Sequence, residues 1–357
     1  MRFSIIIGKL FSAIIVFVIM LLFMLVSLSG PYRPEPEPVY APPAAPASLE
    51  ELLPQGMRDD MGISLRVLSD GLVIDMSMER YLIGAVAAEM PAGFPLEALK
   101  AQAVAARTMV LYIKYVRANA NHPDADVCTD FACCMAFNGD ERLHDRWGDD
   151  YRENIVRIIS AVVGTDGVYM AYNDDPILAV FHSSSAGKTE SSGNVWVTDM
   201  PYLKSVSSPE SSLNVPDFVT TASVSLSEFY EMITESYPDV DFDDFDYEDK
   251  ESWITDITYS ESGRILDLNI CGATVRGPWL RQEFGLRSTA IEIEIGSENI
   301  VFTVTGFGHG VGMSQYGAAV MATSGMNFRE ILRSYYTGVE LQDISPAGAP
   351  ESDQANA

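Results

Sequence analysis

One glutamate interrupts the apolar face of a predicted helix, and its position suits acid–base chemistry. Leu82, Ala85, Val86 and Glu89 recur at three- and four-residue spacing and therefore share one helical face. Glu89 would also lie in the last turn, where the helix dipole disfavours negative charge. Both effects raise a carboxyl pKa, as a general acid working near neutral pH requires. On spacing alone, a glutamate that caps the turn or pairs with a neighbouring base is the simpler interpretation.

A second predicted helix, at about residues 95–117, brings cations toward this acid. Lys100 and Arg107 are seven residues apart and share one face, where the small side chain of Ala103 allows a close approach. Two cations beside one acid would orient substrate oxygens or stabilise charge during a reaction. For Lys100 the alternative is a surface ion pair with Glu97, worth a few tenths of a kcal/mol.

A compact group of metal-ligand side chains follows the second helix. His122, Cys128, Cys133 and Cys134 lie within residues 122–134. Three thiolates and an imidazole suit a closed, tetrahedral zinc site of the structural kind, although adjacent cysteines are unusual ligands. In an exported protein, a disulfide between two of these thiols is the alternative.

The N-terminal segment indicates where the chain works. Residues 1–9 carry Arg2 and Lys9, whereas residues 10–30 (Leu10–Gly30) contain no charged side chain. An uncharged run of this length crosses a hydrocarbon core of about 30 Å as a helix. A cleaved signal peptide is the alternative, but it has a shorter apolar stretch. We therefore predict a cytoplasmic tail, one transmembrane anchor and an extracytoplasmic body, because the basic residues precede the span.

The remaining chain divides by composition. Residues 31–60 are expected to form a proline-rich linker, residues 61–343 a folded body of one or two lobes, and residues 344–357 a flexible tail. Within the body, turn and cap residues predict a hairpin around Asp70-Gly71 and a helix between the N-cap Ser77 and Pro91. Further expected elements are a helix at 151–162, a hairpin around Asp166-Gly167, short strands between 254 and 304, and a last helix at 329–336. Because helices and strands are segregated, the predicted fold class is α+β, with helices carrying Glu89 and a β-rich second half.

Composition excludes one broad class of ligand. The formal net charge is −27, so the phosphates of a nucleic acid would be repelled. A hydrophobic fraction of 47% is ordinary for a globular protein and allows a packed core.

Several runs in order along the chain resemble one known family. They are Ala85–Thr108 (AVAAEMPAGFPLEALKAQAVAART), His182–Ser191 (HSSSAGKTES), Val195–Glu210, Gly306–Ala318 (GFGHGVGMSQYGA) and Ile331–Leu341. Together with the anchor, they resemble the stage II sporulation protein D family, membrane-anchored lytic transglycosylases of endospore-forming bacteria.

The resemblance implies roles for individual residues. It implies that Glu89 is the catalytic acid/base, with supporting roles for Lys100, Arg107, Tyr202 and Lys204. It also implies a His/Cys metal site at residues 122–134. There this chain departs from the family pattern, because a histidine is expected where Cys133 stands, so the site carries one more thiolate.

A lytic transglycosylase needs a single carboxyl, whereas ordinary glycosidases use two. Tyr202 is expected to stack on or hydrogen-bond a sugar ring, and Lys204 to face the lactyl carboxylate of muramic acid. From the residues alone, a partly exposed turn after Pro201 is the simpler interpretation of both. His309 and Gln315 are further candidates for substrate contact, and a histidine that fixes a tight turn is an equal alternative for His309.

The resemblance implies cleavage of peptidoglycan glycan strands that have lost their stem peptides, during engulfment of a forespore by its mother cell. The predicted cofactor is structural zinc. The resemblance implies two partners, the sporulation amidase known as stage II sporulation protein P and a membrane protein of the engulfment machinery. A non-catalytic enhancer of a wall amidase is the alternative function. A zinc amidase or peptidase is disfavoured, because the zinc site has no obvious open position for water.

Overall fold

The computed structural model describes residues 49–53, 63–117, 121–238 and 249–344. The predicted cytoplasmic tail, the predicted membrane span and nearly all of the predicted C-terminal tail lie outside these ranges. Within the described ranges, no helix combines the length and apolar character needed to cross a membrane.

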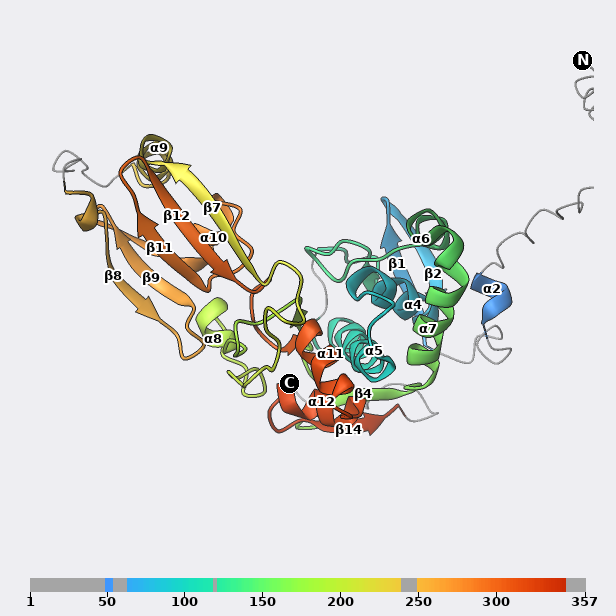
Figure 1. The fold of residues 1–357 in the computed structure, drawn as a ribbon. Coiled ribbons are helices and arrows are strands. Elements are labelled where there is room, and N and C mark those ends of the chain that lie inside the picture. The colour runs from blue at the N-terminus through green and yellow to red at the C-terminus, as the bar shows by residue number, and fades with distance from the viewer. Residues whose placement is uncertain (1–48, 54–62, 118–120, 239–248, 345–357) are drawn as a thin grey trace, which may run out of the picture. The chain divides into compact units, whose positions relative to one another are not determined.

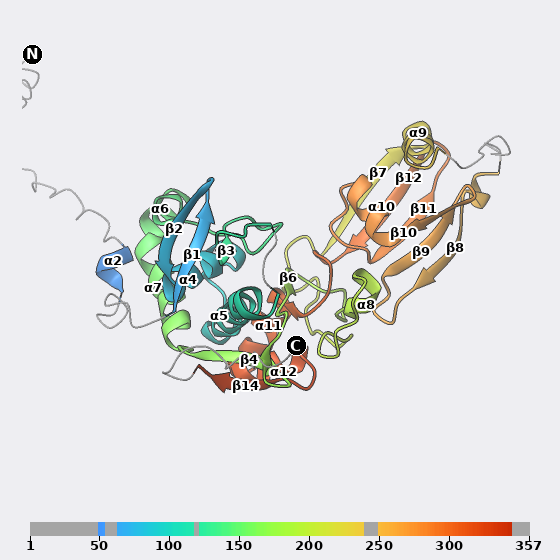
Figure 2. The ribbon, with the colours of Figure 1, turned by 180° about the vertical axis from the view of Figure 1, so that it is seen from behind.

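Helices and strands are both abundant in these ranges, which agrees with the α+β prediction (Figures 1 and 2). The helices are α2 (Leu49–Leu52), α4 (Met78–Glu89), α5 (Leu96–Leu111), the π-helical η1 (Tyr112–Arg117), α6 (Asp140–Trp147), the 3₁₀ turn η2 (Gly148–Asp150), α7 (Tyr151–Val163), α8 (Ser192–Val195), α9 (Leu226–Ser236), the 3₁₀ turn η3 (Lys250–Ser252), α10 (Gly277–Glu283), α11 (Gln315–Thr323) and α12 (Phe328–Tyr335). The strands are β1 (Ser64–Ser69), β2 (Leu72–Ser77), β3 (Val127–Cys128), β4 (Val168–Tyr172), β5 (Asp175–Pro176), β6 (Phe181–His182), β7 (Val219–Ser225), β8 (Ile254–Tyr259), β9 (Ile265–Ile270), β10 (Ala273–Arg276), β11 (Ile291–Ile295), β12 (Asn299–Thr305), β13 (Met313–Ser314) and β14 (Glu340–Asp343).

The buried side chains form separate hydrophobic clusters, and each defines a lobe. The helical lobe comprises the described residues before 219 and after 305, and its core lies among α4, α5, α7 and α12. The β lobe comprises the described residues from 219 to 305. It contains the sheets β10-β9-β8 and β11-β12-β7, together with α9 and α10.

In the helical lobe, local sequence signals place the end of α4. Asp70 and Gly71 adopt φ angles of 48° and 79°, which turn β1 back antiparallel into β2. Ser77 ends β2 and caps α4, since its hydroxyl accepts a hydrogen bond from the Arg80 amide at 3.2 Å. The helix ends at Glu89, before Pro91.

The central helix of this lobe is α5, which packs against α4, α7, α11 and α12. Its buried positions extend almost around its circumference, and most are alanine or another apolar residue. Short side chains let neighbouring helices pack closely from several directions. The helix that carries Lys100 and Arg107 is therefore an internal support.

The structure corrects two sequence-based boundaries. The expected hairpin around Asp166-Gly167 is absent from the described residues: the turn leads from α7 into β4, which pairs with β14 and β5. In addition, α2 lies within the segment expected to be linker, yet Leu49 and Leu53 are buried in the core of the helical lobe. Burial of these leucines stabilises a short helix at the edge of a proline-rich stretch.

Candidate functional site

Glu89 is the last residue of α4 and is partly buried. Its Oε1 atom accepts a hydrogen bond from the Ala136 backbone amide at 3.0 Å. Burial raises the pKa of Glu89, and this hydrogen bond opposes the rise by stabilising the carboxylate. Neither cause is a second carboxylate. Glu89 therefore retains its proton to a higher pH than an exposed glutamate does.

The predicted metal ligands converge in space. The ligand atoms of His122, Cys128, Cys133 and Cys134 all lie within 4.8 Å of one another. Tetrahedral zinc, with Zn–S and Zn–N distances of about 2.3 and 2.0 Å, places its ligand atoms about 3.3–3.8 Å apart. A small contraction of the cluster therefore gives zinc-like spacing. Cys128, Cys133 and Cys134 are free thiols in this structure, so none of them forms the disulfide that was the alternative to zinc.

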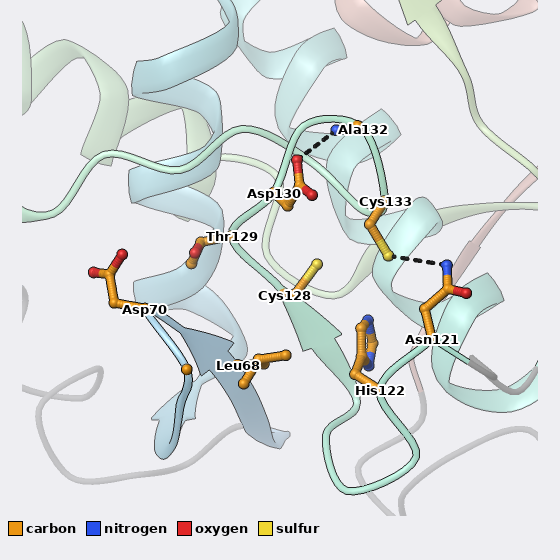
Figure 3. A pocket seen from close by; sticks show the side chains of 10 residues that line it. Leu68, Asp70, Asn121, His122, Cys128, Thr129, Asp130, Ala132 and Cys133 are labelled. Carbon is orange, nitrogen blue, oxygen red and sulfur yellow. Dashed lines mark hydrogen bonds between the residues drawn. The ribbon is translucent and has the colours of Figure 1, made fainter.

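The orientation of His122 also suits a metal. Its Nδ1 atom lies 3.0 Å from the Ala125 carbonyl oxygen, and Nε2 lies 3.2 Å from Cys134 Sγ. A proton on Nδ1, donated to that carbonyl, leaves the Nε2 lone pair directed toward the thiols. Figure 3 shows the sulfur atoms of Cys128 and Cys133 and the His122 ring facing the same space.

A cavity of about 650 Å³ opens beside this cluster, and Figure 3 shows its lining. His122, Cys128 and Cys133 contribute to its wall, together with the acidic side chains of Asp70 and Asp130. Glu89 does not line the cavity. The cavity thus belongs to the metal cluster and is separate from the acid.

Strand pairing positions the metal loop. β3 runs parallel to β1 and places Cys128 beside Leu68. The Tyr81 hydroxyl on α4 donates to the Cys128 carbonyl at 2.7 Å. The loop then continues through Cys134 to Ala136, whose amide binds Glu89. One loop therefore carries both the predicted metal ligands and the hydrogen-bond donor to the acid.

The structure does not place the two predicted cations against Glu89. Lys100 Nζ lies 2.6 Å from Glu97 Oε1, which is the ion pair considered as the alternative from sequence. Arg107 is completely buried; its guanidinium donates to the carbonyls of Thr165, Val168 and Val162 at 2.8, 3.1 and 3.2 Å. The charged group of Arg107 therefore joins α5 to the turn before β4, and its expected contact with substrate stays a prediction.

Tyr202 also differs from expectation, whereas Lys204 is accessible. Tyr202 is 7% exposed, and its hydroxyl accepts a hydrogen bond from the Leu178 amide at 3.2 Å. A ring in this position supports the fold and presents no face for sugar stacking. Lys204 is partly exposed and forms an ion pair with Asp199 at 2.7 Å, so its ammonium group remains available to a competing carboxylate.

His309 and Gln315 both make internal contacts. His309 Nδ1 accepts a hydrogen bond from the Val311 amide at 3.1 Å, as expected for a histidine that fixes a turn. Gln315 is buried at the start of α11, with Nε2 3.5 Å from Gln102 Oε1 on α5. The Gln315 side chain thus contacts α5, and its expected contact with substrate stays a prediction.

Comparisons with known proteins identify the family of this chain. The SpoIID family, described as "Stage II sporulation protein", matches residues 69–172, which include Glu89 and all the predicted metal ligands. Stage II sporulation protein D of Bacillus amyloliquefaciens is 35% identical over 276 residues, covering 77% of each chain. The protein of the same name from Bacillus subtilis is 35% identical over 272 residues, covering 76% of each chain.

This chain belongs to the stage II sporulation protein D family.

This chain is also similar, at lower identity, to a protein with a different name. A Bacillus subtilis protein named Amidase enhancer is 28% identical over 309 residues, which cover 73% of this chain and 40% of that protein. Membership in the stage II sporulation protein D family connects the chain to sporulation. The names of its relatives state no reaction for Glu89, so the chemistry of this residue has to be argued from the geometry of the site.

Sequence reasoning missed the residue that contacts this acid, Ala136. An alanine amide carries no side-chain signal, and it lies 47 positions from Glu89 along the chain. It also missed the contact of Trp196, which stands in one of the runs that resemble the stage II sporulation protein D family. The Trp196 and His309 rings are tilted by 53° with a centroid separation of 5.3 Å. An exposed tryptophan next to a Gly-His-Gly turn is a recognisable signal only after the fold has brought the two segments together.

Proposed function

We propose that this chain is a peptidoglycan lytic transglycosylase with Glu89 as its lone acid/base. The observation that carries the proposal is a partly buried carboxyl that is held by one backbone amide and has a raised pKa, to which no carboxylate of the described residues contributes. A hydrolytic glycosidase needs two carboxyl groups, one on each side of the bond. A single carboxyl is sufficient when the attacking hydroxyl belongs to the substrate itself.

The proposed reaction cleaves the bond between muramic acid C1 and the oxygen of the next N-acetylglucosamine. Glu89 donates its proton to that oxygen as the bond breaks, which releases a sugar hydroxyl. The resulting Glu89 carboxylate then accepts the proton of the muramic acid 6-hydroxyl, whose oxygen bonds to C1. The product is a 1,6-anhydro end, Glu89 is protonated again, and no water is consumed.

The residues around Glu89 have supporting roles in this proposal. The Ala136 amide orients the carboxyl and stabilises its charged form between the two proton transfers. Arg107 and Tyr202 act through the fold, by fixing α5 and the segment before Lys204. Lys204 is the accessible cation available to a lactyl carboxylate, in exchange for Asp199.

We further propose that Zn²⁺ occupies the His122, Cys128, Cys133 and Cys134 cluster in a structural role. Four protein ligands would leave no coordination position for substrate, so the ion would supply a cross-link and no catalytic step. The cross-link would fix the loop that leads to Ala136.

The proposed setting is the outer face of a membrane during engulfment, with stem-peptide-stripped glycan strands as substrate. A sporulation amidase and a membrane protein of the same machinery are the proposed partners. The alternative function is that this chain enhances the activity of an amidase and catalyses no reaction itself. The similarity to the protein named Amidase enhancer favours this alternative.

One experiment separates these functions. Purified glycan strands without stem peptides are incubated with the chain and, in parallel, with Glu89→Gln, and the products are analysed by mass spectrometry. The proposal predicts anhydro-muramic ends with the wild-type chain alone. Hydrolysed reducing ends, or no cleavage except faster amidase action when an amidase is added, would overturn it.

A further inference from the structure

The helix that carries the acid has a weak end of its own. Glu89 is the last residue of α4, and Met90 after it is already extended, with φ −125° and ψ 137°. Many helices end instead at a left-handed glycine, whose neighbouring amides satisfy the free carbonyls of the last turn. In α4 the Met90 amide donates to the Val86 carbonyl at 3.0 Å. The carbonyls after Val86 need donors from elsewhere in the fold.

Arg146 on α6 supplies one of these donors. Its Nη1 atom donates to the Ala87 carbonyl oxygen at 3.2 Å. In a continuing helix that carbonyl would accept from the residue four positions later, which is Pro91, and proline has no amide hydrogen. Since α4 has no basic residue in its last turn, Arg146 also provides the cation that the negative end of a helix favours.

Arg157 on α7 holds the turn that follows the helix. The Phe94 amide donates to the Pro91 carbonyl at 3.0 Å and closes this turn. Arg157 donates through Nε to the Ala92 carbonyl at 2.8 Å and through Nη2 to the Phe94 carbonyl at 2.7 Å. Two donors on one planar guanidinium fix the orientation of the turn as well as its position. Ala92 is buried whereas Pro91 is exposed, so Arg157 grips the turn from its inner side.

Neither arginine is engaged with a carboxylate. Within the residues that the structure describes, Arg146 and Arg157 take part in no ion pair. The pKa of Glu89 is shifted by burial and by the Ala136 amide, and the charges of these arginines do not contribute. Both guanidinium groups therefore act on the backbone around Glu89 and leave its carboxyl group to Ala136.

The acid is thus restrained at two levels. The Ala136 amide holds the carboxyl group at 3.0 Å, and the arginines hold the backbone two residues before Glu89 and three to five residues after it. Proton transfer depends on placement, because a displacement of about 1 Å in a reacting group can cost about 10²-fold in rate.

We propose that Arg157 and Arg146 are positioning residues, which fix the last turn of α4 and thereby hold the Glu89 carboxyl where it exchanges protons with the substrate. The proposal rests on the proposed function, because it names residues that support the same acid. Arg157, with two contacts, has the larger effect, and Arg146, with one, has the smaller.

The test compares variants of the full-length chain in detergent. Arg157→Gln, Arg157→Lys and Arg146→Gln are the test variants. Arg152→Gln and Arg142→Gln are the matched controls, because each removes an exposed arginine from the same helix, α7 or α6. The rate of anhydro-end formation from denuded strands gives kcat and KM. Hydrogen exchange of peptides that contain the Met90 and Phe94 amides reports the helix end, and ¹³C NMR titration, assigned with Glu89→Gln, reports the pKa of Glu89.

We expect Arg157→Gln to lower kcat by about tenfold at an unchanged KM, since the acid is displaced while the substrate contacts remain. Exchange at the Met90 and Phe94 amides should accelerate, because the turn is released. The raised pKa of Glu89 should fall toward its ordinary value as the carboxyl gains water. Arg146→Gln should act in the same directions with smaller effects. Arg157→Lys, which keeps the charge but not the planar pair of donors, should lie between Arg157→Gln and the wild type, and both controls should match the wild type.

Unchanged exchange and an unchanged Glu89 titration in Arg157→Gln and Arg146→Gln would overturn the proposal. A higher KM with kcat unchanged would also overturn it, because the arginines would then contact the substrate. The exposed position of Arg146 keeps the test decisive if Arg157→Gln does not fold. A wild-type chain that forms no anhydro ends would remove the lyase, whereas exchange and titration would still decide whether these arginines position Glu89.

Discussion

The backbone amide of Ala136 donates a hydrogen bond to Glu89 Oε1 across 3.0 Å. This contact joins the end of α4 to the loop that carries the His122, Cys128, Cys133 and Cys134 cluster. Burial and the amide act on the Glu89 pKa in opposite directions, and burial prevails. An acid that donates and then recovers a proton needs both burial and a hydrogen-bond donor. Burial keeps the carboxyl group protonated at the start, and the amide stabilises the carboxylate between the two steps.

Replacement of the acid is the most direct test of its role. Glu89→Gln keeps the side-chain volume and an oxygen acceptor for Ala136 but removes the transferable proton. General acid–base catalysis contributes about 10²–10⁴-fold to a rate, so we expect a loss of that size in anhydro-end formation, measured by mass spectrometry of denuded strands. Glu97→Gln is the control, because Glu97 is bound to Lys100 and should leave the rate unchanged. A Glu89→Gln chain with ordinary activity would exclude Glu89 from the chemistry.

The same variant should alter the pH dependence of stability. Because the folded-state pKa of Glu89 is raised, the folded chain binds this proton more tightly than the unfolded chain. The associated stabilisation is present below the unfolded value of about 4.3 and is lost as pH rises through the folded pKa. Glu89→Gln lacks this loss, so its free energy of unfolding should exceed that of the wild type increasingly across that window, by roughly 1.4 kcal/mol for each unit of pKa elevation. Urea denaturation at several pH values measures the difference, and a constant offset would contradict the raised pKa.

Removal of the metal should loosen the contact with the acid. We expect elemental analysis to find one zinc ion per chain, and a chelator to lower the thermal midpoint and accelerate hydrogen exchange at the Ala136 amide. The physical reason is that the ligands Cys133 and Cys134 closely precede Ala136, so the metal restrains its position. Cys128→Ser should reproduce both effects. Cys271→Ser is the matched control, since Cys271 lies in the β lobe outside the cluster. If hydrogen exchange at the Ala136 amide were unchanged after chelation, the metal would not restrain the amide that binds Glu89.

Glycine at position 84 provides a steric test of the same loop. A Cβ atom on Gly84 would meet Phe137 Cε2 at 2.2 Å, so Gly84→Ala must displace the ring beside Ala136. We expect lower stability by about 1–3 kcal/mol and a reduced rate of strand cleavage. Ala87→Gly on the same helix is the comparison for a general loss of helix stability. A Gly84→Ala chain that loses stability but cleaves at the wild-type rate would show that the position of Phe137 does not matter for Glu89.

Local signals predicted the elements around the acid, and tertiary contacts decided the rest. The hairpin and the limits of α4 follow from Asp70-Gly71, Ser77 and Pro91, which act on their immediate neighbours. The metal ligands were predictable because they lie close together in the chain. The hairpin expected at Asp166-Gly167 was wrong because β4 pairs with the short strand β5 and with β14, where Gln342 stands opposite Tyr169, 173 positions away.

The environments of individual side chains were harder to predict than the helices that carry them. The spacing of Lys100 and Arg107 placed both on one face of α5, but neighbouring helices and β4 enclose this helix from several sides. The burial of Arg107 and its contacts with backbone carbonyls were therefore not predictable from that spacing.

The burial of Arg107 gives a prediction that distinguishes support of the fold from substrate binding. Its guanidinium donates to carbonyls that end α7 and begin β4, and these acceptors would remain buried without it. Arg107→Gln should therefore lower the free energy of unfolding by about 2–4 kcal/mol, because buried charged hydrogen bonds are lost. Lys100→Gln, on the same helix, removes only a partly exposed ion pair and should cost less than about 1 kcal/mol. Urea denaturation of both variants gives the comparison. If Arg107→Gln were as stable as the wild type yet bound glycan more weakly, a direct role at the substrate would replace the structural one.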